Sequence, residues 1–160
     1  MAKLFSSCKY LVLLVAALFV VSCSSLPEGA SAPKLKVESL SLSHQGPEPQ
    51  FIITYTLEHA SASALPVKGI EADIFLNNVK VATIERKKIS NQMVAPHEKQ
   101  QFELLVPVNL VGSASIDSLT NNSLLVLQGS CALSVHFTEE EDLKSFNPSY
   151  SYSGLVRVVR

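Results

Sequence analysis

Apolar and polar residues alternate in short runs over most of the chain, from residue 34 to the C-terminus. A period of two is typical of a strand that buries one face, because successive side chains point to opposite sides of a sheet. The clearest run is 125–137, in which the odd positions form one apolar face: Leu125, Leu127, Gly129, Cys131, Leu133, Val135 and Phe137. Together with 35–42, 51–57, 70–76, 79–88, 102–108 and 151–159, this run predicts about seven strands.

Three local features refine these strands. The apolar face of 35–37 continues at 40–42 in the opposite register, which predicts a β-bulge or a strand that changes sheet. Asn77-Asn78 predicts a tight hairpin turn, because Asn tolerates a positive φ angle. Pro107 has no N–H to donate to a neighbouring strand, so we expect its strand to end there or to lie at a sheet edge.

The segments between the strands are expected to be loops, with one exception. Residues 60–66 read as a loop, 94–98 as a turn, and 139–142 as an acidic loop. Ser115–Thr120 is predicted to form a short helix, with Ser115 as its N-cap.

This succession of short strands, with at most one short helix, predicts an all-β fold. The expected architecture is a single antiparallel β-sandwich with Greek-key connections. The chain contains no Trp, so the Cys and Trp core of an antibody-type domain is missing. A length of 160 residues points to one domain.

The N-terminus carries a different pattern. Tyr10–Val21 is an uninterrupted apolar run of twelve residues, preceded by Lys3 and Lys9. A helix that spans a bilayer needs about 20 residues, whereas a short run behind a positively charged start is typical of a secretory signal peptide.

The apolar run ends in Val20-Val21-Ser22-Cys23, which resembles a bacterial lipobox. The resemblance implies cleavage before Cys23 and acylation of that residue; the alternative is an ordinary secretory peptide cut near Ser22. The expected organisation is a signal peptide at 1–22, an acylated Cys23 with a flexible tether at 23–34, and a β domain at 35–160. The tether reading rests on the Ser, Pro, Gly and Ala residues of 24–34.

Charge and cysteine content narrow the class of protein further. The net charge is -1, which lacks the strong positive footprint of a nucleic-acid binder. Cleavage before Cys23 would leave Cys131 as the free thiol, so no disulfide scaffold is expected. Residue 24 is Ser rather than the Asp that tends to retain lipoproteins in the inner membrane. Similarity to that rule implies an outer-membrane protein facing the periplasm, if the source is a diderm bacterium.

The order of several weak motifs resembles a known family. The chain has Leu65-Pro66-Val67 before a strand, a Leu76-Asn77-Asn78 hairpin, a Val94-Ala95-Pro96 turn before QFELLVPV, and Leu127-Gln128-Gly129 inside the long strand. Over residues 35–159 this order is similar to the late-embryogenesis-abundant (LEA) type 2 family, also called the WHy domain. It departs from the family's pattern at Glu58-His59-Ala60. The resemblance implies a sandwich like that of immunoglobulin and fibronectin type III domains, with a non-enzymatic, stress-protective role.

No group of residues points to catalysis, a cofactor or a metal. The four His residues, at 44, 59, 97 and 136, share no metal-ligand spacing. His44 and His97 lie in predicted turns, where we expect them in solvent. His136 lies on the polar face of the long strand. Cys131 lies on an apolar face, where a thiol is inert. The acidic run 139–142 reads as a solvated loop or a cation site, and Arg86-Lys87-Lys88 as a solvated strand end or a contact for anionic headgroups.

The sequence thus predicts a membrane-anchored, non-enzymatic envelope lipoprotein with a protective or binding domain. Its expected partners are the membrane, through the lipid anchor, and client proteins or envelope components, with no nucleic acid. The alternative is a structural or adaptor subunit of an envelope assembly, recruited through an exposed strand edge.

Overall fold

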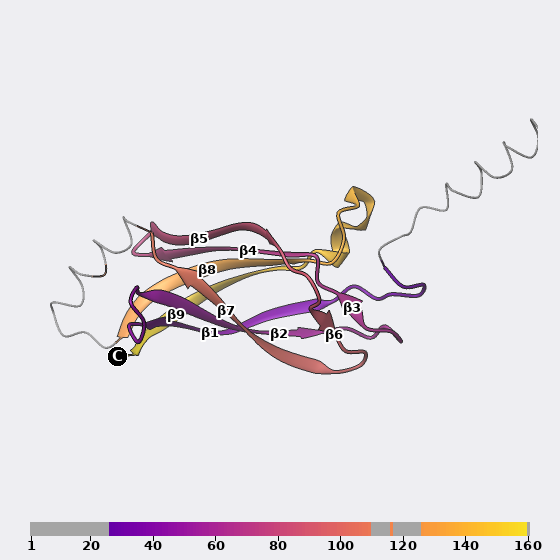
Figure 1. Ribbon diagram of the computed structural model, residues 1–160, viewed down its shortest axis with the longest axis horizontal. Coiled ribbons are helices and arrows are strands. Elements are labelled where there is room, and N and C mark those ends of the chain that lie inside the picture. The colour runs from indigo at the N-terminus through magenta and orange to yellow at the C-terminus, as the bar shows by residue number, and fades with distance from the viewer. Residues whose placement is uncertain (1–25, 110–115, 117–125, 160) are drawn as a thin grey trace, which may run out of the picture.

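A computed structural model describes residues 26–109, 116 and 126–159 of the chain (Figure 1). Seven strands form one sheet in the order β5-β4-β8-β9-β1-β2-β7, and β3 and β6 pair in a small second sheet. The strands are β1 (Lys34–Ser43), β2 (Gln50–Glu58), β3 (Leu65–Pro66), β4 (Gly69–Leu76), β5 (Val79–Lys88), β6 (Met93–Val94), β7 (Lys99–Pro107), β8 (Val126–His136) and β9 (Ser149–Val159). A 3₁₀-helix, η1 (Glu141–Phe146), precedes β9.

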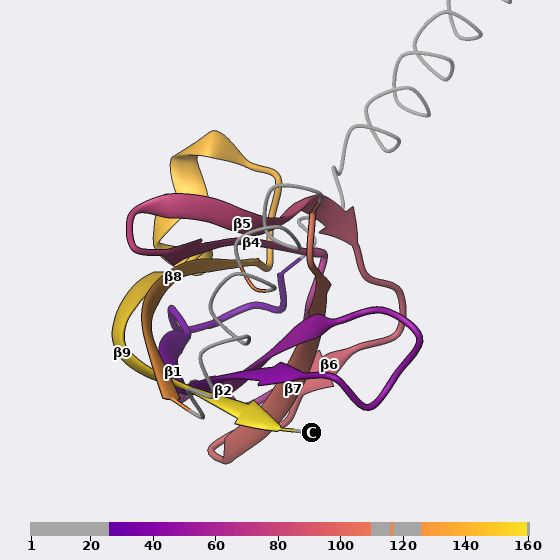
Figure 2. The same ribbon diagram turned by 90° about the vertical axis from the view of Figure 1, so that its left-hand side faces the viewer.

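The seven-stranded sheet curls around its own inner face. In the end-on view of Figure 2 the strands describe a half-barrel. The buried apolar side chains of the strands form one cluster. The two outermost strands come together at one end, where Ala82 and Val108 form an isolated antiparallel bridge. The curl encloses one hydrophobic core, whose largest fully buried side chains include Phe51, Phe137, Leu40, Ile53, Leu57, Ile70, Ile74 and Leu133.

The all-β class is confirmed, but a sandwich of antiparallel strands is not. The described strands of the main sheet lie in one mixed sheet, because β1 and β9 pair in parallel through Leu40–Ser43 and Val156–Val159. The other strand pairs of this sheet are antiparallel. A period of two predicts which face of a strand is buried, but it carries no information on which strand is the neighbour or in which direction that neighbour runs.

The finer predictions of strand register are confirmed. The pairing of β1 with β2 shifts between Val37 and Ser39, which is a bulge at the predicted phase slip. Asn77 and Asn78 have φ angles of 49° and 65°, as a tight hairpin between β4 and β5 requires. Strand β7 ends at Pro107, at one edge of the sheet.

Two expected loops contain more structure than predicted. Residues 60–66 include β3, whose Leu65 is fully buried opposite Val94 of β6. The acidic run 139–142 leads into η1, which is kinked at Leu143, and the apolar Leu143 and Phe146 pack against the core. The helix predicted at 115–120 lies outside the described residues except for Ile116, which is buried.

The segment expected to be a flexible tether is packed against the domain from residue 26 onward. Leu26 is only 8% exposed and belongs to the hydrophobic core, and Ala30 packs against the same core. A turn bonded from the N–H of Ala30 to the carbonyl of Pro27 at 3.1 Å separates them. We call residues 26–33 the N-terminal strap, because they contact the domain instead of extending away from it.

Candidate functional site

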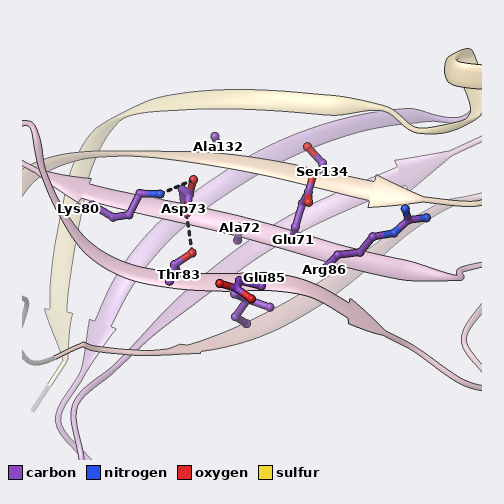
Figure 3. A pocket seen from close by; sticks show the side chains of 10 residues that line it. Glu71, Ala72, Asp73, Lys80, Thr83, Glu85, Arg86, Ala132 and Ser134 are labelled. Atoms are coloured by element: carbon purple, nitrogen blue, oxygen red, sulfur yellow. Dashed lines mark hydrogen bonds and ion pairs between the residues drawn. The ribbon is translucent and has the colours of Figure 1, made fainter.

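A shallow polar hollow lies on the outer face of the sheet, across β4, β5 and β8 (Figure 3). Its volume is about 410 Å³. Ala72, Ile84 and Ala132 supply the apolar part of the lining. Outward-facing positions of the three strands supply the polar part: Glu71, Asp73, Lys80, Thr83, Glu85, Arg86 and Ser134. Because alternate residues of β4 bury their side chains in the core, the polar residues between them are presented together on this face.

Asp73 is the most firmly held side chain of the hollow. Its Oδ1 accepts a hydrogen bond from the Thr83 hydroxyl at 2.6 Å, and its Oδ2 lies 2.9 Å from the Lys80 Nζ. The Thr83 hydrogen bond and the neighbouring Lys80 ammonium hold the pKa of the Asp73 carboxyl below its usual value. A carboxylate that is stabilised in this way is a poor proton acceptor, so Asp73 positions its neighbours and is not suited to general-base work.

Glu71, at the other side of the hollow, pairs with a histidine that lies outside the hollow's lining. The Nε2 of His136 lies 3.2 Å from Oε1 of Glu71, at the distance of an ion pair if the imidazole is protonated. Neither ring nitrogen of His136 makes a hydrogen bond to another described group, and its side chain is 14% exposed. His136 lies on the outer face of β8, as predicted, but it is more enclosed than a solvated histidine.

The remaining histidines are dispersed over the molecule. His97 is exposed, as predicted, in the turn after β6. His44 is half-buried and its Nε2 is shielded without a partner, so the prediction that it is solvated is wrong. His59 is buried beside β6. Among residues 26–109, 116 and 126–159, no group of three or more His, Cys, Asp or Glu is arranged to hold a metal ion.

Two further candidates from the sequence are placed by the structure, and a third is not. Arg86-Lys87-Lys88 ends β5 with all three side chains exposed. Cys131 is buried, as predicted, on the inner face of β8. Cys23, the predicted acylation site, lies outside the described residues.

Burial raises the pKa of the Cys131 thiol to about 11. The thiol therefore carries almost no thiolate at neutral pH, and the thiolate is the reactive form. In a variant with Cys8 and Cys23 replaced by Ser, we expect a thiol reagent at pH 7.5 to label the folded chain roughly a hundredfold more slowly than the chain in denaturant. Native labelling as fast as that of the unfolded chain would show that Cys131 is accessible.

The described side chains of the polar hollow can bind, but they do not form a nucleophile with an activating base. Ser134 faces Glu71 across the strand pair, with no described histidine hydrogen-bonded to its hydroxyl. Open polar surfaces with ion pairs and free hydrogen-bonding groups suit contact with a polar ligand or partner surface. Sequence reasoning missed the hollow, although the polar residues that flank the Asn77-Asn78 hairpin were a usable signal for it.

The comparisons with known proteins give a limited result. No model of a known protein family matches the chain, and no curated protein matches it. Among solved structures, a protein from Archaeoglobus fulgidus is similar over 80% of this chain and 96% of its own, with 13% sequence identity and a TM-score of 0.49. The LEA type 2 resemblance therefore stays a prediction.

The described residues also contain no helix that is long and apolar enough to cross a membrane.

Proposed function

We propose that the chain is a membrane-anchored envelope lipoprotein whose domain binds or protects partners and catalyses no reaction. The observation that supports it most is the sequence Val20-Val21-Ser22-Cys23, which stands only three residues ahead of Leu26 in the hydrophobic core. An extended chain covers about 3.5 Å per residue, so Leu26, three positions after Cys23, lies within about 10 Å of it. Acylation of Cys23 would therefore hold the domain at the membrane surface, which in a diderm bacterium is the periplasmic face of the outer membrane.

A binding role is supported by the way the polar groups are used. Asp73 is engaged by Thr83 and Lys80, and both ring nitrogens of His59 are hydrogen-bonded within the fold. The polar hollow on β4, β5 and β8 offers the remaining charged groups on an open surface, which suits an extended partner better than a small enclosed substrate. Stress protection of client proteins, as the LEA type 2 resemblance implies, is the form of binding that we propose.

We extend the proposal to the fold. The half-barrel is a variant of the immunoglobulin-like or fibronectin-III-like sandwich, in which β1, β2 and β7 face β5, β4 and β8 across the core and β9 joins the two groups. Three family-like motifs support this reading by their positions. Leu65-Pro66 forms β3, Asn77-Asn78 forms the hairpin turn, and Leu127-Gln128-Gly129 lies in β8.

Lipidation is the first test of this proposal. Replacing the acylated residue (Cys23→Ala) should abolish the incorporation of a labelled fatty acid and leave a larger, unprocessed precursor, because the acyl chain is attached to this thiol before cleavage. Labelling is measured on the full chain expressed in a bacterial host. The matched controls are Cys8→Ala and Cys131→Ala, which should both keep the label. Label that survives Cys23→Ala would remove the anchor from the proposal.

A second candidate function is that of an adaptor subunit in an envelope assembly, and one observation favours it. Strand β7 lies at the edge of the sheet, and Leu105 in its middle is 51% exposed. Exposed strand edges recruit partner strands. A photo-crosslinker at position 105 should capture one stoichiometric partner if the chain is an adaptor, with position 153 on β9 as control. Prevention of client aggregation without any such partner would favour the protective role.

A further inference from the structure

The N-terminal strap is held by the burial of Leu26 and Ala30 against the core and, at Ser31, by hydrogen bonds to one short loop. The backbone N–H of Ser31 donates to the Ser61 hydroxyl at 2.7 Å, and the N–H of Ala60 donates to the Ser31 hydroxyl at 2.9 Å. The Ser61 hydroxyl also lies 3.4 Å from the Ser31 carbonyl, as its donor. Residues 59–61 and Ser31 of the strap therefore form a clasp, and the position of the loop decides whether these hydrogen bonds are made.

The loop is in turn held by His59, which is 3% exposed. The Nε2 of His59 lies 2.9 Å from the carbonyl oxygen of Val94, and the N–H of Ser61 donates to Nδ1 at 3.2 Å. A carbonyl only accepts and a backbone N–H only donates, so the Nε2–H tautomer of the neutral ring satisfies both partners. The clasp thus uses the lone pair of Nδ1.

A second proton on His59 is incompatible with this arrangement. Protonated Nδ1 becomes a donor that faces the Ser61 N–H, another donor, and the charge is placed in a site with little access to water. His59 also lines a second hollow, separate from the polar hollow of β4, β5 and β8. The other titratable side chains that line this second hollow are Lys34 of β1, Glu58 of β2 and His97 of the turn after β6. The neighbouring Met93–Val94 and Leu65–Pro66 strands, and Ser31 and Ala32 of the strap, contribute no titratable group.

We propose that protonation of His59 opens the clasp and releases the N-terminal strap from the domain. The clasp is closed while the imidazole is neutral and opens when acid places a second proton on the ring. This switch does not depend on acylation.

Its consequence for reach does rest on the proposed function. With the strap closed, the domain begins at Leu26, three positions after Cys23, a reach of about 10 Å. With the whole strap released, it begins at Lys34, eleven positions after Cys23, a reach of about 38 Å. Acid would therefore lengthen the connection between the membrane and the domain.

The test follows the full-length chain in detergent micelles by NMR between pH 8 and pH 5. At pH 8, nitrogen-15 shifts of His59 should report the Nε2–H tautomer. As His59 takes up its proton, the protection factors of the Ser31, Ala60 and Ser61 amides should fall about tenfold, since a buried hydrogen bond is lost and a charge is left in its place. Amides in β8 should keep their protection.

Two variants separate this mechanism from general acid unfolding. His59→Asn places an amide oxygen near the position of Nδ1 and does not titrate, so its strap amides should show no loss of protection at pH 5. His97→Asn removes the neighbouring titratable ring and should respond as the natural chain does.

Three results would each overturn the proposal: an Nδ1–H tautomer at pH 8, unchanged strap protection while His59 protonates, or an acid response that survives His59→Asn. If His59→Asn does not fold, the first two results on the natural chain still decide. Failure of the lipidation test leaves all of these outcomes unaffected, so the two proposals fail separately.

Discussion

Leu133→Ala is expected to lower the free energy of unfolding by about 2–5 kcal/mol. Leu133 is fully buried on the inner face of β8, which pairs with β4 on one side and β9 on the other. Its direct neighbours are Ala72 and Tyr150. Truncation removes apolar contacts and leaves a cavity that the surrounding strands fill poorly, because both neighbours are fixed by the sheet.

The matched control is Ser134→Ala, one residue further along the same strand. Ser134 faces outward into the polar hollow, so its loss should change the free energy of unfolding by less than about 0.5 kcal/mol. Chemical denaturation of the purified chain, followed by far-UV circular dichroism, measures both values. Similar losses at the two positions would contradict the register of β8.

Gly129→Ala is expected to destabilise the domain by about 1–3 kcal/mol, because the core has no room for the added methyl group. A Cβ at position 129 would lie 2.8 Å from a terminal carbon of Leu76, 2.9 Å from a methyl carbon of Val156 and 3.0 Å from the carbonyl oxygen of Phe75. Leu76 and Val156 are buried, so neither can move aside without disturbing the core. The glycine thus allows β4 and β9 to direct their side chains over β8.

Gly46→Ala provides the contrast for this substitution. Gly46 is exposed in the turn between β1 and β2, and a Cβ there would meet only the Glu48 carbonyl oxygen, at 3.6 Å. We expect a change within about 0.5 kcal/mol, measured by the same denaturation experiment. A harmless Gly129→Ala would mean that the packing of Leu76 and Val156 over β8 is looser than described.

Much of the strand pattern could be predicted from the sequence, because burial of one face of a strand makes apolar and polar residues alternate along it. The shift at 37–39, the Asn77-Asn78 turn and the buried odd positions of β8 each depend on residues that are close in sequence. The partnership of β1 with β9 depends on residues more than a hundred positions apart, and no local pattern encodes it. The order and direction of the strands in the sheet were therefore harder to predict from the sequence than the strands themselves.

The candidate site, too, depends on strand pairing that the local sequence does not determine. Counting outward from the two-residue hairpin pairs Asp73 with Ala82, but an extra residue in β5 moves the partner of Asp73 to Thr83. That shift creates the hydrogen bond between the Asp73 carboxylate and the Thr83 hydroxyl, and only the structure reveals it. The clasp at His59 was equally hidden, since Ser31 and Val94 are far from His59 in the sequence.

The parallel pairing of β1 with β9 has a consequence for how the domain folds. The first strand cannot obtain its second neighbour until the last eleven residues of the described chain are available, so β9 completes the sheet by joining strands from opposite ends of the polypeptide. Contacts between distant parts of a chain form slowly, because a long loop must close before they stabilise anything. During synthesis or export from the N-terminus, one edge of β1 therefore stays unpaired until β9 is available. We expect the chain to be most prone to aggregation during this period.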